Sequence, residues 1–238
     1  LVSDVSTTFT AKNGGKIDIQ SSTTYIGNAE DKELGYTNKS ATFNVGKDSS
    51  ISFQQLEVYA KTDINLTDGG EFLATGVDLH AGSEMFIEGA GSVSLGEVAV
   101  GGSAALNVEG TTLVFTERAN ITVNGGSLTL DNVAFELVLN DATGNDFSSL
   151  VEFEYDVLKG LTEDAALGYV ESLNAGTIDV TIKGLVDGEL VALNAGALSF
   201  SNDGGTVSIK GSASIPEPTT ATLSLLALAA LAARRRRK

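Results

Sequence analysis

The sequence predicts an all-β protein, a right-handed parallel β-solenoid with a 21-residue coil repeat. Apolar residues recur every 21 positions between residues 43 and 123, and within each repeat they alternate with polar residues over short runs. The chain holds 27 glycines, which suit tight corners, and only two prolines. A fixed repeat of short strands without a helical period is typical of a β-solenoid. Right-handed winding is expected from the handedness of parallel crossover connections.

Five columns of apolar residues define the repeat and run through four successive coils. Stacked coils lie about 4.8 Å apart, so each column is expected to form a continuous buried ladder. The columns are Phe43, Ile64, Met85 and Leu106; Val45, Leu66, Ile87 and Val108; Ile51, Phe72, Val93 and Val114; Leu56, Val77, Val98 and Ala119; and Val58, Leu79, Val100 and Ile121.

The body divides into a solenoid over residues 1–139, with strict register at 43–123, and final coils with a cap over residues 140–214. After Val123 the apolar positions fit the columns only if one coil is about six residues shorter. The cap is expected because a solenoid needs its open end covered. It contains a short predicted helix near 162–173, in which Thr162 is the N-cap and the first turn is acidic.

Composition limits the chemistry that this chain can perform. It has no cysteine and one histidine, His80, so disulfides, thiolate metal sites and zinc sites with two histidines are excluded. Thirty-one Asp and Glu stand against ten Lys and Arg ahead of the last five residues, a net charge of −21. Such a body repels nucleic acid and polyanionic glycans, so we expect no nucleic-acid partner. We also expect no cofactor.

The C-terminal tail, residues 215–238, has three distinct parts. Pro216, Glu217 and Pro218 make a stiff extended hinge. Residues 221–233 are uncharged and dominated by Ala and Leu, which predicts a C-terminal apolar helix of roughly 20 Å. The hydrocarbon core of a bilayer is roughly 30 Å thick, so this helix is short for a permanent membrane span. Its length suits a segment that membrane-bound machinery recognises and then removes. The five cations at the end are expected to stay cytoplasmic.

This order of hinge, Leu/Ala helix and basic end resembles the PEP-CTERM sorting signal of Gram-negative bacteria. The resemblance implies cleavage by an exosortase-type membrane protease near Pro216-Glu217-Pro218, and delivery to the cell surface or extracellular matrix. Residues 219–238 would be a transient inner-membrane tether. An ordinary C-terminal helix with a basic end is the alternative. The cytoplasmic stop would be formed by Arg234, Arg235, Arg236, Arg237 and Lys238.

The start of the chain also bears on export. It opens at Leu1 with neither an initiator Met nor a basic-then-apolar leader, so we expect a processed form from which a signal peptide has been removed. The body resembles in a general way the passenger β-helices of autotransporter adhesins.

One outward-facing patch, made of Glu57, Tyr59, Asp78 and His80, is the candidate site. The 21-residue step places Glu57 above Asp78 and Tyr59 above His80. Two stacked carboxylates could serve glycoside hydrolysis or bind Ca²⁺ weakly. The patch could equally be a solvated face of an acidic protein. We assign no catalytic residue and no metal site, because no long corner loop is expected to raise a wall beside this face.

Two functions follow from these observations. The first is a structural, adhesin-like surface or matrix protein that contacts surface glycans or matrix polysaccharide. The second is a carbohydrate-active enzyme on a β-helix, either a glycoside hydrolase or a polysaccharide lyase. A lyase needs cations to neutralise a uronic acid, and Arg118, the only arginine outside the tail, is expected to pair with Glu97. A groove with convergent carboxylates near Glu57 and Asp78 would favour the enzyme.

Overall fold

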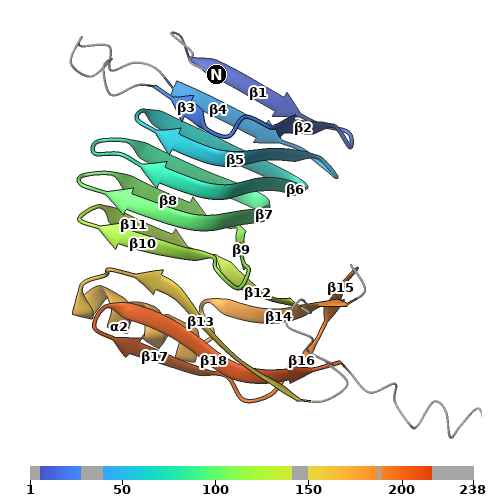
Figure 1. Ribbon diagram of the computed structural model, residues 1–238, viewed down its shortest axis with the longest axis vertical. Helices are drawn as coiled ribbons and strands as arrows, with labels where there is room; N and C mark the ends of the chain where they lie inside the picture. Colours follow the sequence, from blue (N-terminus) through green and yellow to red (C-terminus); the bar gives the residue numbers. More distant parts are fainter. Residues whose placement is uncertain (1–5, 28–39, 141–149, 187–188, 216–238) are drawn as a thin grey trace, which may run out of the picture.

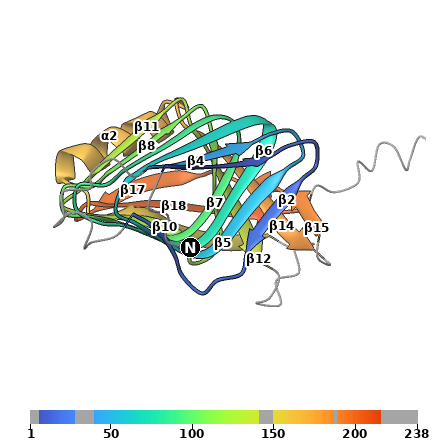
Figure 2. The same cartoon turned by 90° about the horizontal axis from the view of Figure 1, so that it is seen from above.

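The computed structural model describes residues 6–27, 40–140, 150–186 and 189–215. It is an all-β body that winds as a β-solenoid of about four turns and carries one short helix among these residues. The coils stack from β1 (Thr7–Ala11) at one end to β12 (Ala134–Asn140) near the other, as Figure 1 shows. Viewed along the stack, the coils superimpose as nested loops (Figure 2). The predicted all-β solenoid is therefore confirmed, and the handedness of the winding stays a prediction.

The solenoid strands pair in parallel with the strands of the coils above and below. Each coil runs along two faces, and the second face carries either one long strand segment, as in residues 50–58, or two short ones, as in residues 16–19 and 24–26. The remaining strands of this part are β2 (Lys16–Ile19), β3 (Thr24–Ile26), β4 (Ser40–Val45), β5 (Ser50–Val58), β6 (Lys61–Leu79), β7 (Glu84–Gly101), β8 (Ala105–Glu109), β9 (Thr112–Phe115), β10 (Asn120–Asn124) and β11 (Ser127–Asp131).

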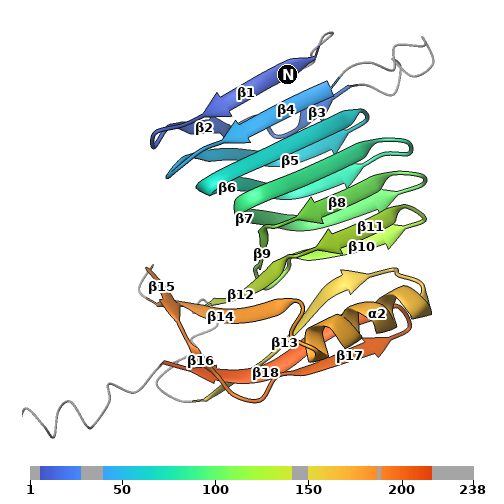
Figure 3. The ribbon, with the colours of Figure 1, turned by 180° about the vertical axis from the view of Figure 1, so that it is seen from behind.

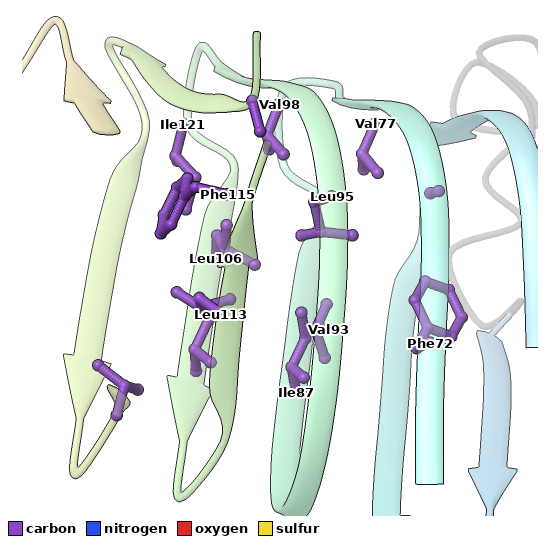
Figure 4. Close-up of a cluster of buried hydrophobic side chains, with 14 of the residues drawn as sticks. Phe72, Val77, Ile87, Val93, Leu95, Val98, Leu106, Leu113, Phe115 and Ile121 are labelled. Carbon is purple, nitrogen blue, oxygen red and sulfur yellow. The ribbon is translucent and has the colours of Figure 1, made fainter. Parts of the chain in front are cut away.

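The core lies between the two faces and consists of inward side chains from alternate positions. Figure 4 shows Phe72 and Val77 of one coil and Val98 of the next pointing into this interior. Phe43 and Phe72 are buried and their rings meet edge to face at 5.6 Å between centroids. Each buried aliphatic or aromatic side chain contributes about 1.5–3 kcal/mol of transfer free energy before ordering entropy is subtracted. The ladders therefore supply the main stabilisation of a chain that has no disulfides.

The 21-residue register is confirmed for all five columns at their first step, where Phe43 pairs with Ile64 and Val45 with Leu66. Ile51 pairs with Phe72, Leu56 with Val77, and Val58 with Leu79. The same step continues from Val77 to Val98 and from Leu79 to Val100 in the next coil.

The first departure from this register lies at the turn after Leu79. The structure pairs Ile64 with Ile87, whereas the sequence predicted Met85. The turn at residues 80–83 is longer than the connection after Val58, and the corner at 67–69 of β6 compensates for the extra length. Because the shift is by an even number of positions, side chains stay on the same face and the core is preserved.

The second departure lies in the next coil and changes which residues face inward. Val93 pairs with Leu113 and not with the predicted Val114, so Leu113 is buried and Val114 is half-exposed. Three extra residues then follow, because five residues separate Val114 from Asn120 where two separate their partners in β7. Residues 116–119, here called the corner loop, form a turn in which the Ala119 N–H donates to the Thr116 carbonyl at 2.9 Å.

The corner loop also shifts the pairing in the last two predicted columns. Val98 pairs with Ile121 and not with Ala119, and Val100 pairs with Val123 and not with Ile121. The expected shortening of one coil after Val123 is wrong as well. Leu106 pairs with Leu128, which is within one position of the 21-residue step, so this coil keeps its length.

The C-terminal part continues the stack and then closes it with antiparallel strands. Strand β14 pairs in parallel with β12, whereas β13 and β18 pair with each other in antiparallel fashion. Figure 3 shows the helix α2 lying beside β17 and β18. The elements are β13 (Val151–Lys159), α2 (Glu163–Asn174), β14 (Asp179–Val186), β15 (Glu189–Ala192), β16 (Asn194–Ala195), β17 (Ser199–Asp203) and β18 (Thr206–Ser214).

The predicted helix is confirmed one residue later than expected. The Thr162 hydroxyl accepts a hydrogen bond from the Ala165 N–H at 3.3 Å, which caps the helix. Tyr169 donates its hydroxyl proton to the Leu128 carbonyl at 3.0 Å and so ties the helix to the solenoid. The tail from Pro216 onward, with its predicted apolar helix, lies outside the described residues. Within the described residues, no helix combines the length and apolar character that a membrane span requires.

The observed register predicts opposite sensitivities for two neighbouring residues. Replacing Leu113 by Ala should lower the free energy of unfolding by about 2–5 kcal/mol, because it leaves a cavity in the ladder. Replacing Val114 by Ala should cost less than about 1 kcal/mol, because that side chain faces outward. Urea unfolding followed by circular dichroism measures both. If Val114→Ala lowered the free energy of unfolding more than Leu113→Ala did, the predicted 21-residue register would hold at this coil instead.

Candidate functional site

The ends of β5 and β6 bring the four predicted patch residues together. Glu57 and Asp78 are register partners on adjacent strands. The Tyr59 and His80 rings stack with centroids 3.9 Å apart and planes 4° apart. His80 Nε2 lies 2.6 Å from Glu57 Oε2, so the four side chains make one connected network on the outer surface.

The contact between His80 and Glu57 limits what Glu57 can bind. Its carboxylate is partly buried and is already engaged by the imidazole, which forms an ion pair with it when protonated. Across the described ranges, no group of three or more His, Asp or Glu side chains is arranged to hold a metal ion. Weak Ca²⁺ binding by this patch stays a prediction.

Asp78 has a different environment because Gln55 reaches across to it. Gln55 Nε2 donates to Asp78 Oδ2 at 3.0 Å. This contact requires glycine at position 76, since a Cβ there would overlap the Gln55 amide. Partial burial, and then the nearby Glu57 carboxylate, raise the pKa of Asp78 above its usual 3.8. Gln55 was not among the predicted patch residues, although it lies two positions before Glu57 on the same face of the strand.

A groove opens beside Asp78, where the sequence predicted no raised wall. A cavity of about 470 Å³ lies over Gly76 and Gly96, with the corner loop rising beside it. Apart from the two glycines and Ala119, the residues that line this cavity are polar. The cavity is lined by Gln55, Thr75, Gly76, Asp78, Gly96, Glu97, Thr116, Arg118 and Ala119.

A second cavity of about 330 Å³ continues the first toward the C-terminal part. The two cavities share Glu97, Arg118 and Ala119, and the second one extends to Glu154 and Lys159 on β13. We call the two together the axial groove, because they run along the stack from β5 to β13. The expectation of a face without walls is therefore wrong, and the cause is the expansion of the chain at the corner loop.

Arg118 lies at the junction of the two cavities, but it does not form the expected ion pair with Glu97. None of the described carboxylates lies within 4.0 Å of its guanidinium, and its backbone carbonyl accepts a hydrogen bond from Asn120 Nδ2 at 3.1 Å. The groove thus presents free donors of Arg118 beside the carboxylates of Asp78 and Glu97. Such an arrangement suits a ligand that both donates and accepts hydrogen bonds.

The comparisons with known proteins bear on the tail of the chain. Residues 214–238 match the PEP-CTERM protein-sorting motif. Searches among curated proteins and among solved structures gave no significant match. The motif implies export toward the cell surface and processing by an exosortase-type membrane protein.

The network predicts how the pKa of Asp78 responds to its neighbour. Replacing Glu57 by Gln removes a nearby negative charge, so the pKa of Asp78 should fall. It should remain above 3.8, because burial is the larger cause of the shift. Carboxyl-carbon NMR titration of the wild type and the variant measures this change. A pKa that stays constant or rises would mean that the two carboxylates do not interact.

Proposed function

We propose that this chain is an adhesin-like β-solenoid that is displayed on the cell surface or in the extracellular matrix and binds glycans there. The single observation that carries the proposal is a sorting motif attached to a self-supporting rod with an open polar groove on its side. The described rod is stabilised by buried ladders of apolar side chains and has no disulfide. Such a self-supporting fold suits a protein that is exposed outside the cell.

The route to the surface follows from the tail. We propose cleavage near Pro216-Glu217-Pro218, after residues 219–238 have served as a transient inner-membrane tether with a cytoplasmic stop at residues 234–238. Processing by an exosortase-type membrane protein agrees with the matched motif.

The groove supports binding through its openness and its polar lining. A ligand can enter along the whole length of the groove, and amide, hydroxyl, carboxylate and guanidinium groups line its first cavity. Glycans offer many hydroxyl groups that can meet such donors and acceptors. Surface glycan or matrix polysaccharide is therefore the partner that we propose.

A second candidate function, a glycoside hydrolase, is favoured by one observation. The raised pKa of Asp78 suits a general acid, and Glu97, in the adjacent strand, could activate water as the general base. The open groove excludes little water, so it supports this function less than it supports binding. A polysaccharide lyase is less well supported still, because Arg118 is outnumbered by carboxylates around it.

A glycan array probed with the full chain, followed by product analysis, distinguishes the two functions. We expect retention on at least one glycan and no new reducing ends after prolonged incubation. Release of reducing ends that disappears in Asp78→Asn would establish the hydrolase instead. An array without any retained glycan, together with an absence of products, would contradict both functions.

A further inference from the structure

We propose that the axial groove holds an uncharged saccharide chain aligned with the solenoid axis, and that Arg118 determines this specificity. The proposal rests on the glycan-binding function above and names its ligand class and its central contact. Four features of the groove support it. They are the corner loop that forms one side, the guanidinium of Arg118 without an ion pair among the described residues, the glycines at positions 76 and 96, and the excess of carboxylates.

The wall exists because one coil departs from the repeat. In the preceding coils the chain passes this corner with two residues between the paired positions, and the corner loop adds three more. The added residues do not extend the core, since Thr116, Glu117 and Arg118 are all exposed. Their side chains line the groove instead. An insertion that serves no packing role and forms one side of a cavity fits a binding role.

Arg118 is the exception among the cations of its region. Residues 62–215 hold 23 Asp and Glu and only four Lys and Arg. Three of the four form ion pairs with described carboxylates, namely Lys159, Lys183 and Lys210. Arg118 has no such pair among the described residues, even though Glu97 and Glu117 line the same groove. Its planar fork of donors is therefore available to adjacent hydroxyl groups of a ligand.

The floor lets a ring approach the backbone closely. Gly76 and Gly96 both line the first cavity, and a Cβ at position 96 would overlap the Thr75 carbonyl oxygen. Neither glycine projects a side chain into the space between Gln55 and the corner loop. Asp78 is held at its edge by Gln55 and faces the groove as an oriented acceptor.

The charge balance of the groove disfavours an anionic ligand. Five carboxylates line the two cavities, and the body around them is strongly acidic, so a polyanion is repelled. A polycation would be attracted by these carboxylates but would leave the donors of Arg118 without an acceptor. A neutral sugar instead accepts hydrogen bonds from Arg118 and donates hydroxyl protons to Asp78 and Glu97. Because the groove crosses several coils at about 4.8 Å each, it spans more than one sugar unit.

The test uses the full chain with dextran, laminarin and xylan as uncharged probes and alginate as the anionic probe, in affinity electrophoresis. We expect wild type to bind at least one uncharged polymer and not alginate. Arg118→Ala should weaken that binding about tenfold or more, since a charge-assisted hydrogen bond is lost. Arg118→Lys should restore only part of it, because an ammonium lacks the fork.

Lys61→Ala is the matched control, because this exposed lysine lies away from the groove and pairs with Asp63. It should bind within about twofold of wild type. Equal melting temperatures of the variants would show that folding is unchanged. Full binding by Arg118→Ala, tight binding of alginate, or failure of wild type to bind all three neutral polymers would each overturn the proposal. Glycan-array retention independent of Arg118 would leave the broader glycan-binding function standing.

Discussion

The whole structure depends on the stacking of inward apolar side chains between coils that are hydrogen-bonded in parallel. Ile51 over Phe72, and Leu56 over Val77 over Val98, set the height and rotation of each coil relative to the next. Because side chains alternate along a strand, fixing the inward ladders also fixes the outward columns. Glu57 therefore meets Asp78, and Tyr59 meets His80, as a consequence of the core.

The same constraint decides where the chain can vary. An even-numbered change at the turn after Leu79 keeps every side chain on its face, and it is absorbed by the corner at 67–69. At Val114 the pairing shifts by one position, an odd number, so Leu113 takes the inward position in place of Val114. The three extra residues at the corner loop then bring Ile121 opposite Val98. The extra residues have no place in the core, so they project outward and build the wall of the groove.

Much of the architecture could be predicted from the sequence, because the ladders leave a periodic signal. The fold class and the contact of Glu57 with Asp78 follow from alternation and a 21-residue step, and the helix follows from the Thr162 N-cap and the acidic first turn. The corner loop was hidden because Val114 and Ala119 are apolar, so the wrong register remained plausible. The guanidinium of Arg118, which has no ion pair among the described residues, depends on the unforeseen corner loop, and the bridge from Gln55 to Asp78 depends on side-chain rotamers that the repeat does not encode.

The separation of Thr10 and Asp131 tests this account most directly. The two exposed residues are 121 positions apart in sequence, yet the register links them through Asn44, Asn65, Glu88 and Glu109 in five coil steps. The absence of native cysteine allows a nitroxide to be attached to an engineered cysteine at each position. Double electron–electron resonance should then give a narrow distribution centred at about 24 Å, because each of the five steps adds about 4.8 Å. A broad distribution, or a centre beyond about 35 Å, would contradict the stacked solenoid.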